Sequence, residues 1–263
     1  MSSPQHSGIS VSIVSHGQMA MVVNLLKDLE AWCRSSIVEV ILTLNLAESF
    51  VFNHEGYDFP VRVIQNTVPK GFAANHNHAA SKVRGSLLCI MNPDLRIHED
   101  ILTPLAEVMN RYPQVGLAAP RVIDKQGRIE DSARYFPHPW EVLSKAMGGK
   151  SRRFESSGDA IIFPDWVAGM LLLIRVPLFQ KLKGLDARYF LYYEDVDFCA
   201  RLRLAGHRIA YVSSTVVVHE AQRTSHRNLR YMRWHLSSML RFFLSSVYRR
   251  VRKQQSSQAP WSL

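Results

Sequence analysis

Three carboxylates stand together at the start of an expected helix, behind an aromatic and apolar run. Glu194, Asp195 and Asp197 follow residues 189–193, and the helical pattern after them stops at Gly206. Acids are favoured there because the helix macrodipole and the free backbone N–H groups attract negative charge. An acid beside apolar bulk can also become a general base with a tuned pKa. The segment therefore offers a proton acceptor. The alternative is that these acids only cap the helix and are exposed to solvent.

Two further polar positions are expected where strands end. His219 closes a strand-like run, where an imidazole can face a ligand, although a lone histidine is more often structural. Asn92-Pro93-Asp94 ends a nearly continuous apolar run, and its proline fixes a turn that projects Asp94 beyond the sheet edge. A carboxylate there could hold Mg²⁺ or Mn²⁺ on a diphosphate, because hard cations prefer oxygen ligands. An ordinary Asx-type turn is the alternative.

A glycine turn rich in hydrogen-bond donors occupies residues 69–78, with the sequence Pro-Lys-Gly-Phe-Ala-Ala-Asn-His-Asn-His. It could contact a nucleotide through Lys70, through backbone N–H groups around Gly71, and through the amides of Asn75 and Asn77. Its spacing matches neither a Walker loop nor a dinucleotide fingerprint. A helix cap that binds no ligand explains the same residues about as well.

The elements that must position these groups alternate between strand and helix patterns. Apolar runs predict strands over residues 9–14, 38–44, 61–64 and 86–91. Helices are expected over 18–32 and 101–112, and residues 71–82 are expected to form a loop that opens into a helix. Such alternation implies βαβ units and a mostly parallel, buried sheet, so the expected fold class is α/β. Ligands of these sheets bind at the carboxyl ends of the strands. The candidates that follow the strands are Ser15, His16, Asn45, Asn66 and the turn from Asn92 to Asp94.

The second half of the chain is less regular. Residues 116–158 contain many glycine, proline and basic residues, and we expect a mobile connection there. A strand-like pattern returns over 165–175 and carries Gly169. The three cysteines, Cys33, Cys89 and Cys199, show neither metal nor disulfide spacing, which predicts buried apolar thiols in a reducing cytoplasm.

The charge of the chain is concentrated at one end. The formal net charge is +10, but nine cations follow Glu220 with no acid among them, so residues 1–220 carry only about +1. In the same tail, apolar side chains recur at spacings of three and four: Leu229, Met232, Leu236, Met239, Leu240, Phe243, Leu244 and Val247. A basic amphipathic helix suits the surface of an anionic membrane. A helix docked on the body with a solvated basic face is the alternative, and both can hold.

Taken together and in order, these motifs resemble the family 2 glycosyltransferases of the GT-A fold. Within that family they are most similar to bacterial L-rhamnosyltransferases that act on lipid-linked sugars. The resemblance covers about residues 9–245, and it is carried by residues 14–17, 71–77, 91–94, 165–169, 189–197, 205–219 and 233–236. It implies a GT-A sheet, Rossmann-like and flanked by helices, with a basic amphipathic helical tail, and direct displacement with inversion at the anomeric carbon.

The resemblance also implies roles for single residues. Asp195 matches the catalytic base with Glu194 as its partner, and Asp94 and His219 match ligands of a divalent metal. Trp166 and Gly169 fall near the donor sugar and the acceptor. The nucleotide and donor site falls on Ser15, His16, Asn45, Lys70, Gly71, Phe72, Asn75, Asn77, Asn92 and Asp94.

Two residues depart from the family pattern. Asn92 stands where the metal-binding motif has its first acid, which leaves strict metal dependence open. Leu44 stands where an acid usually follows the second strand, which leaves the identity of the nucleotide open.

The resulting hypothesis is an inverting transferase that moves L-rhamnose from dTDP-rhamnose to a GlcNAc-diphospho-polyprenol during O-antigen or cell-wall synthesis. Its expected organisation is a nucleotide-sugar half (1–112), an acceptor and catalytic half (113–222) and basic helices (223–263). Residues 223–253 would hold it on the inner face of the cytoplasmic membrane. Nucleic acid is not an expected partner, and the oligomeric state stays open. The alternatives are a transferase for galactofuranose or another hexose, a catalytically silent sugar-nucleotide sensor, and a nucleic-acid-binding protein with a basic tail.

Overall fold

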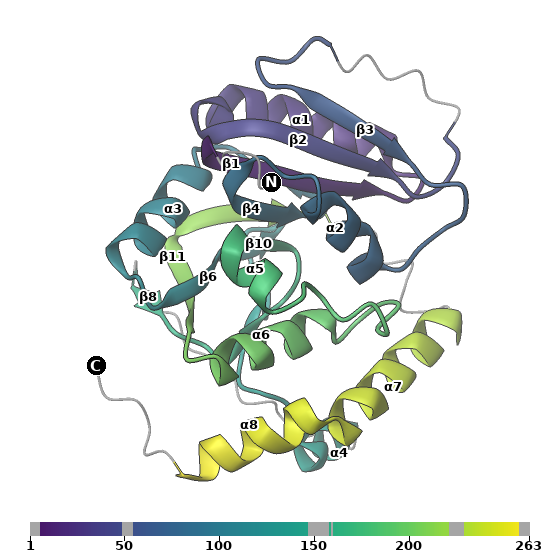
Figure 1. Cartoon of the computed structure of the whole chain (residues 1–263), viewed down its shortest axis with the longest axis vertical. Coiled ribbons are helices and arrows are strands. Elements are labelled where there is room, and N and C mark those ends of the chain that lie inside the picture. The colour runs from purple at the N-terminus through teal and green to yellow at the C-terminus, as the bar shows by residue number, and fades with distance from the viewer. Residues whose placement is uncertain (1–5, 49–54, 147–157, 159, 221–228, 258–263) are drawn as a thin grey trace.

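The fold is built on one large sheet with helices on both faces (Figure 1). The computed structural model describes residues 6–48, 55–146, 158, 160–220 and 229–257. Within these residues nine strands form the sheet, in the order β3-β2-β1-β4-β10-β6-β11-β5, with β8 paired to β11. Their bounds are β1 His6–Ser15, β2 Ile37–Leu44, β3 Val61–Gln65, β4 Gly85–Met91, β5 Leu95–Arg96, β6 Val115–Asp124, β8 Ile161–Ile162, β10 Leu171–Arg175 and β11 Arg208–His219.

The sheet is mostly parallel, as the alternating pattern predicts. β1 runs parallel to β2 and β4, β2 to β3, and β6 to β11. β10 is antiparallel to both of its neighbours, β4 and β6. The carboxyl ends of β1, β2, β3 and β4 therefore lie at one edge, where α/β sheets bind their ligands. A small second sheet pairs β7 (Ala133–Arg134) with β9 (Trp166–Val167).

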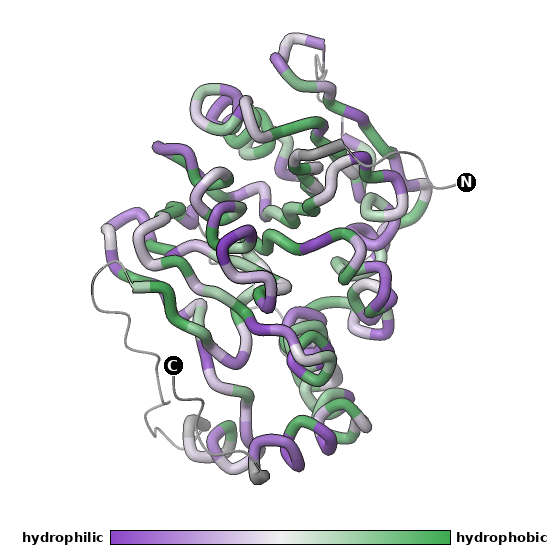
Figure 2. The backbone as a smooth tube through the Cα atoms, turned by 60° about the vertical axis from the view of Figure 1, so that its left-hand side comes forward, coloured by the Kyte–Doolittle hydropathy of each residue, from purple (hydrophilic) through white to green (hydrophobic). Residues whose placement is uncertain are grey.

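Helices cover both faces of the sheet and create two hydrophobic cores. Their bounds are α1 Met19–Cys33, the 3₁₀ turn η1 Arg34–Ser36, α2 Phe72–Ala80, α3 Leu102–Arg111, α4 Pro139–Ala146, α5 Val176–Lys181, α6 Glu194–Leu204, α7 Leu229–Leu244 and α8 Ser246–Ser257. One core packs side chains of α1 and α3 on the sheet, and the other packs those of α5, α6 and α8. Figure 2 shows hydrophobic and hydrophilic stretches following one another along the traced chain, as expected of elements that turn one side toward these cores.

The strands predicted over 9–14, 38–44, 61–64 and 86–91 are confirmed by β1 to β4. The mobile connection expected over 116–158 is wrong in its first part, because β6 occupies Val115–Asp124 in the middle of the sheet. Glycine and proline made this strand resemble a loop. Gly116 is needed because an added Cβ would lie 2.4 Å from a methyl carbon of Leu178, and Pro120 is tolerated within the pairing to β11.

The C-terminal helices pack against the body rather than standing apart. α7 and α8 lie along the lower edge of Figure 1, and α8 contacts α6. Phe242, Tyr248 and Val251 belong to the second core. Arg223 and Arg227 of the predicted basic tail lie outside the described residues. The three cysteines are buried and free, as predicted, and none of the described helices has the length and apolar character needed to span a bilayer.

Candidate active site

Asp195 lies in a cavity of about 480 Å³ that gathers residues from distant parts of the chain. Its lining includes Asn92 at the end of β4, Trp166 on β9, Gly169 before β10, and Glu194 at the start of α6. The Asp195 carboxylate is held from two sides. Its Oδ2 accepts the N–H of Gly169 at 3.0 Å, and its Oδ1 accepts the N–H of Val196 at 2.8 Å. The predicted base and the predicted sugar-site residues thus share one cleft.

An unusual backbone turn delivers Asp195 to this position. Tyr192 and Tyr193 are both left-handed, with φ of 69° and 67°. Each such bulky residue costs on the order of 1–2 kcal/mol, so surrounding contacts must hold the turn. The turn makes Glu194 the first residue of α6 and puts Asp195 in the first helical turn, where the macrodipole favours a negative charge.

Burial and proximity tune the two adjacent acids. Burial raises the pKa of Asp195, while the N–H groups of Val196 and Gly169 and then the charge of Arg134 lower it; the net direction is upward. Glu194 is 5% exposed, and burial followed by the charge of Asp195 raises its pKa well above the usual range. A protonated Glu194 beside an ionised Asp195 leaves one carboxylate to accept a proton.

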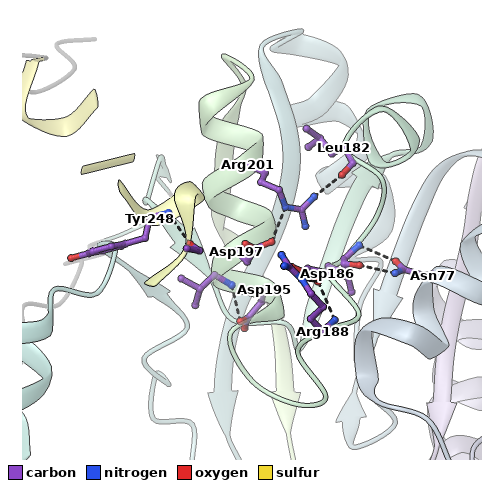
Figure 3. A network of polar contacts seen from close by, with 11 residues as sticks. Asn77, Leu182, Asp186, Arg188, Asp195, Asp197, Arg201 and Tyr248 are labelled. Carbon is purple, nitrogen blue, oxygen red and sulfur yellow. Dashed lines mark hydrogen bonds and ion pairs between the residues drawn. The ribbon is translucent and has the colours of Figure 1, made fainter. Parts of the chain in front are cut away.

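The third acid of the cluster has a structural role. Asp197 is buried, and its Oδ2 accepts the Nε–H of Arg201 at 2.7 Å (Figure 3). Arg201 also donates to the carbonyl of Leu182, which ties α6 to the end of α5. Burial raises the pKa of Asp197 while the charge of Arg201 opposes this. The pair therefore anchors the helix that carries the predicted base.

The structure places side by side Asp94 and His219, the two residues predicted to bind a metal. β5 pairs with the end of β11, with Leu95 opposite His219, so Asp94 directly adjoins the histidine. The Nε2 atom of His219 lies 3.3 Å from Oδ2 of Asp94, and its Nδ1 lies 2.9 Å from Oε2 of Glu130. Burial lowers the pKa of His219, but hydrogen bonds and charges from Asp94 and then Glu130 raise it to about 9.

These residues fit a divalent cation. Oδ1 of Asp94 is buried and, within the described residues, has no hydrogen-bond partner. A carboxylate on the far nitrogen of a histidine is the usual support for a metal-bound imidazole, and Glu130 provides it here. A metal would displace the proton of His219. The described residues contain no group of three or more His, Cys, Asp or Glu arranged for a metal, so the donor diphosphate would have to complete the coordination.

Buried amides shape the predicted nucleotide edge. Oδ1 of Asn45 accepts the N–H of Lys70 and the side-chain N–H of Asn66, both at 2.8 Å. Asn66 also donates to Asn75, and both Asn45 and Asn75 donate to the carbonyl of Lys70. Asn77 makes two hydrogen bonds to the backbone of Leu185. These amides hold the loop that precedes α2, and their contact with a nucleotide stays a prediction.

The remaining predicted residues lie around the same edge. Ser15 is buried, with its Oγ 2.5 Å from Oε1 of Glu48, while His16 is exposed beside Asn45. Gly71 is required by a close approach, since an added Cβ would lie 2.5 Å from the carbonyl oxygen of Phe190. Phe72 lines the cavity of Asp195.

Several lining residues were not predicted from the sequence. Arg134 places its guanidinium 5.1 Å from the centre of the Trp166 ring and pairs with Asp131 at 3.2 Å. His235 of α7 and Tyr135 also line the cavity. Arg134 and Tyr135 come from the supposed connection, where no motif marked them. His235 lies in segment 233–236, which carries part of the family resemblance but was given no role in the site. Only pairing of β7 with β9 and docking of α7 bring them to the site.

Comparison with known proteins agrees with this geometry. Residues 34–170 match the family model described as glycosyl transferase family 2. The chain is 30% identical over 256 residues to rhamnosyltransferase WbbL of Escherichia coli (strain K12), which covers 89% of this chain and 92% of that protein. It is 29% identical over 156 residues to an N-acetylglucosaminyl-diphospho-decaprenol L-rhamnosyltransferase of Mycobacterium tuberculosis, which covers 53% of this chain and 48% of that protein, about half its length.

A solved structure supports the fold. The mannosyltransferase PcManGT of Pyrobaculum calidifontis, in complex with GDP-Man and Mn²⁺, superimposes with a TM-score of 0.57 at 14% identity. The match covers 99% of this chain and 79% of that one. The similarity establishes an α/β sheet of the GT-A type.

Proposed function

Because the chain belongs to glycosyl transferase family 2, we propose that it transfers L-rhamnose from dTDP-rhamnose to a GlcNAc-diphospho-polyprenol. The chain is a glycosyltransferase of the hexosyl class, and donor and acceptor are the proposed part. The two rhamnosyltransferase relatives support this choice, and the name of one of them contains the GlcNAc-diphospho-lipid acceptor. The observation that carries the proposal is the cavity that unites Asp195, Gly169, Trp166 and Asn92.

The proposed reaction is a single displacement. The acceptor hydroxyl oxygen attacks the anomeric carbon, the bond from that carbon to the diphosphate oxygen breaks with its electron pair, and the configuration inverts. The hydroxyl proton passes to Asp195, whose Oδ2 is held by the N–H of Gly169, another residue of the cavity lining. Because the base is fixed before the substrates bind, substrate binding alone can bring the acceptor hydroxyl, the anomeric carbon and the base into the geometry that the reaction needs.

Charge that develops on the leaving diphosphate must be offset. Asp94 and His219 are the residues that would hold a divalent cation, which would stabilise that charge when bound. Glu130 keeps the imidazole oriented for this role. Asn92 offers an amide oxygen, a weaker metal ligand than a carboxylate, so the cation is proposed to depend largely on Asp94.

A donor screen followed by a transfer assay tests the proposal. The melting temperature is measured with dTDP-rhamnose, UDP-galactofuranose, UDP-GlcNAc and GDP-mannose, each with and without Mn²⁺. A donor at a hundredfold its Kd stabilises the native state by about 2.7 kcal/mol, since it binds only the folded chain. For a chain of 263 residues that corresponds to a shift of about 5 °C, because the entropy of unfolding is about 2.1 cal/mol/K per residue.

The transfer assay then uses the donor that shifts the melting temperature, together with GlcNAc-diphospho-lipid. We expect dTDP-rhamnose to give the largest shift and a rhamnosylated lipid with inverted anomeric configuration. A larger shift with another nucleotide sugar would replace the proposed donor. Donor binding without product on any lipid acceptor would support the silent sensor instead.

The proposed location follows from the acceptor. A polyprenyl diphosphate is anchored in a membrane, so we propose that the enzyme works at the inner face of the cytoplasmic membrane. The basic composition of residues 229–257 supports this, because these residues include seven arginines and lysines and no acid.

A further inference from the structure

Helix α7 braces the loop that carries the catalytic base. The ring of Trp234 lies 4.6 Å from that of Phe190, and the hydroxyl of Ser238 donates to the carbonyl of Leu191 at 2.9 Å. The ring of His235 lies 5.4 Å from Tyr192. One face of α7 thus contacts successive residues of the turn that leads into α6.

The brace reaches the strained residue next to Glu194. Tyr193 has a left-handed backbone, and its ring packs 5.7 Å from Phe242 and 5.6 Å from His235. Phe242 is fully buried, so this contact belongs to the core. The position of α7 is therefore tied to the position of Asp195.

Helix α7 also forms part of the cavity wall. His235 lines the cavity of Asp195, together with Glu141 and Val142 of α4. On the helix surface Met232 is the neighbour of His235 one turn earlier, because residues three apart lie on the same side. Met232 is 54% exposed, so exposed apolar surface begins beside the cavity.

The face of α7 away from the body is an exposed apolar stripe, which we call the leucine stripe. Its members are Leu229, Met232, Leu236, Leu240 and Leu244. They recur at spacings of three and four, so they share one face, and each is between 47% and 78% exposed. Ser238 and Phe242, the buried residues of α7, lie on the opposite face. Exposed large apolar side chains gathered in this way usually mark an interaction surface.

The charges around the leucine stripe indicate what covers it. Arg233 and Arg241 are exposed on α7, and Arg249, Arg250 and Arg252 are exposed on α8. The chain contains no acid from residue 229 to residue 257. An apolar stripe flanked by arginines complements the hydrocarbon boundary and the negative headgroups of an anionic bilayer. Such a surface would fit a neutral protein groove less well, because the arginines would lose hydration without gaining a counter-charge.

We propose that α7 is an interfacial helix whose leucine stripe enters an anionic lipid surface while its opposite face holds the turn before Asp195. The acceptor part of this inference rests on the proposed function. Attachment through the stripe places the mouth of the cavity next to the headgroups, where a lipid-linked diphosphate sugar can reach the base without leaving the bilayer.

The test uses the full chain with Leu236 and Leu240 both changed to serine. These side chains are 47% and 56% exposed, so the fold should tolerate the change. Trp32→Ser with Val63→Ser is the matched control, because those side chains are 49% and 40% exposed on α1 and β3, on the other side of the molecule (Figure 1). Flotation is measured with vesicles of phosphatidylcholine containing phosphatidylglycerol and with vesicles of phosphatidylcholine alone.

We expect the wild type and the control to float with the anionic vesicles. We expect the affinity of the stripe variant for these vesicles to be lower by a factor of about ten or more. Turnover of an acceptor embedded in those vesicles should fall in parallel, while turnover of a water-soluble acceptor with a short alkyl chain should be unchanged. Wild-type flotation of the stripe variant would overturn the proposal. So would a wild-type dimer that dissociates in the stripe variant, since the stripe would then pair two copies. Flotation needs no sugar transfer, so its outcome is independent of the donor and acceptor proposed above.

Discussion

Replacing Asp195 with asparagine separates the role of the base from that of the fold. Asparagine keeps the size of the side chain but cannot accept the acceptor proton. General-base catalysis contributes about 10²–10⁴-fold to rate, so kcat should fall by that factor, which corresponds to about 3–5 kcal/mol of transition-state stabilisation. The KM for the nucleotide sugar should change little, because the proposed mechanism assigns the carboxylate to the acceptor hydroxyl.

The structure also sets the expected cost to stability. Both oxygens of Asp195 accept backbone N–H groups, from Gly169 and from Val196. An amide has one oxygen, so one of those hydrogen bonds is lost, at a cost of about 1.5–3 kcal/mol for a bond to a charged group. Removal of a buried charge that also raises the pKa of Glu194 offsets part of that cost. We therefore expect a melting temperature a few degrees below that of the wild type.

The assay measures product formation and the donor-induced thermal shift on the same preparation. Asp186→Asn is the matched control, because Asp186 lies on the loop before α6 and pairs with Arg188 at 2.6 Å rather than lining the cavity. It should keep wild-type kcat. Turnover by Asp195→Asn within a factor of about ten of the wild type would refute the assignment of the base. Loss of the donor-induced shift would show instead that Asp195 binds the nucleotide sugar.

Three further outcomes follow from the site. Because the pKa of Asp195 is raised, its ionised base form is lost as pH falls through that pKa. The decline of log kcat on the acid side should therefore begin at a higher pH than an ordinary aspartate would give. A pH profile of kcat that stays flat down to pH 4 would contradict this. Glu130→Gln should weaken Mn²⁺ affinity about 10–100-fold by removing the carboxylate on the His219 ring, as measured by titration with Mn²⁺; unchanged affinity would count against the metal site. Gly71→Ala should lower the free energy of unfolding in denaturant by about 1–3 kcal/mol, because the added Cβ would lie 2.5 Å from a backbone oxygen. Gly56→Ala is the control and should be close to neutral, because no heavy atom lies within 4 Å of the Cβ added there.

The leading half of the fold could be predicted because its signals are local. The run 87–91 is apolar on both faces, as expected of a strand covered by helices on both sides, and the local sequence alone reveals this. Polar residues after each strand predicted which edge carries the site, since parallel strands end together. The acids at 194–197 predicted a helix start for the same local reason.

The central strand β6 could not be predicted in the same way. Its sequence contains Gly116 and Pro120, residues that usually mark loops. They are tolerated because Leu178 fills the space over the glycine and because pairing to β10 and β11 fixes the rest of the strand. Those partners are distant in sequence, so no window of the chain records them.

The sequence by itself determined the residue types of the site, with the proposed base at 195, a carboxylate at 94 and a histidine at 219, because these follow recognisable strand and helix boundaries. Only the tertiary structure decided which of them meet and what surrounds them. The pairing of β5 with β11 joins Asp94 to His219, and the docking of α7 brings His235 to the cavity. Turn chemistry and apolar periodicity are local properties of the chain, whereas strand partners and helix docking depend on the total burial of all elements together, which no single segment encodes.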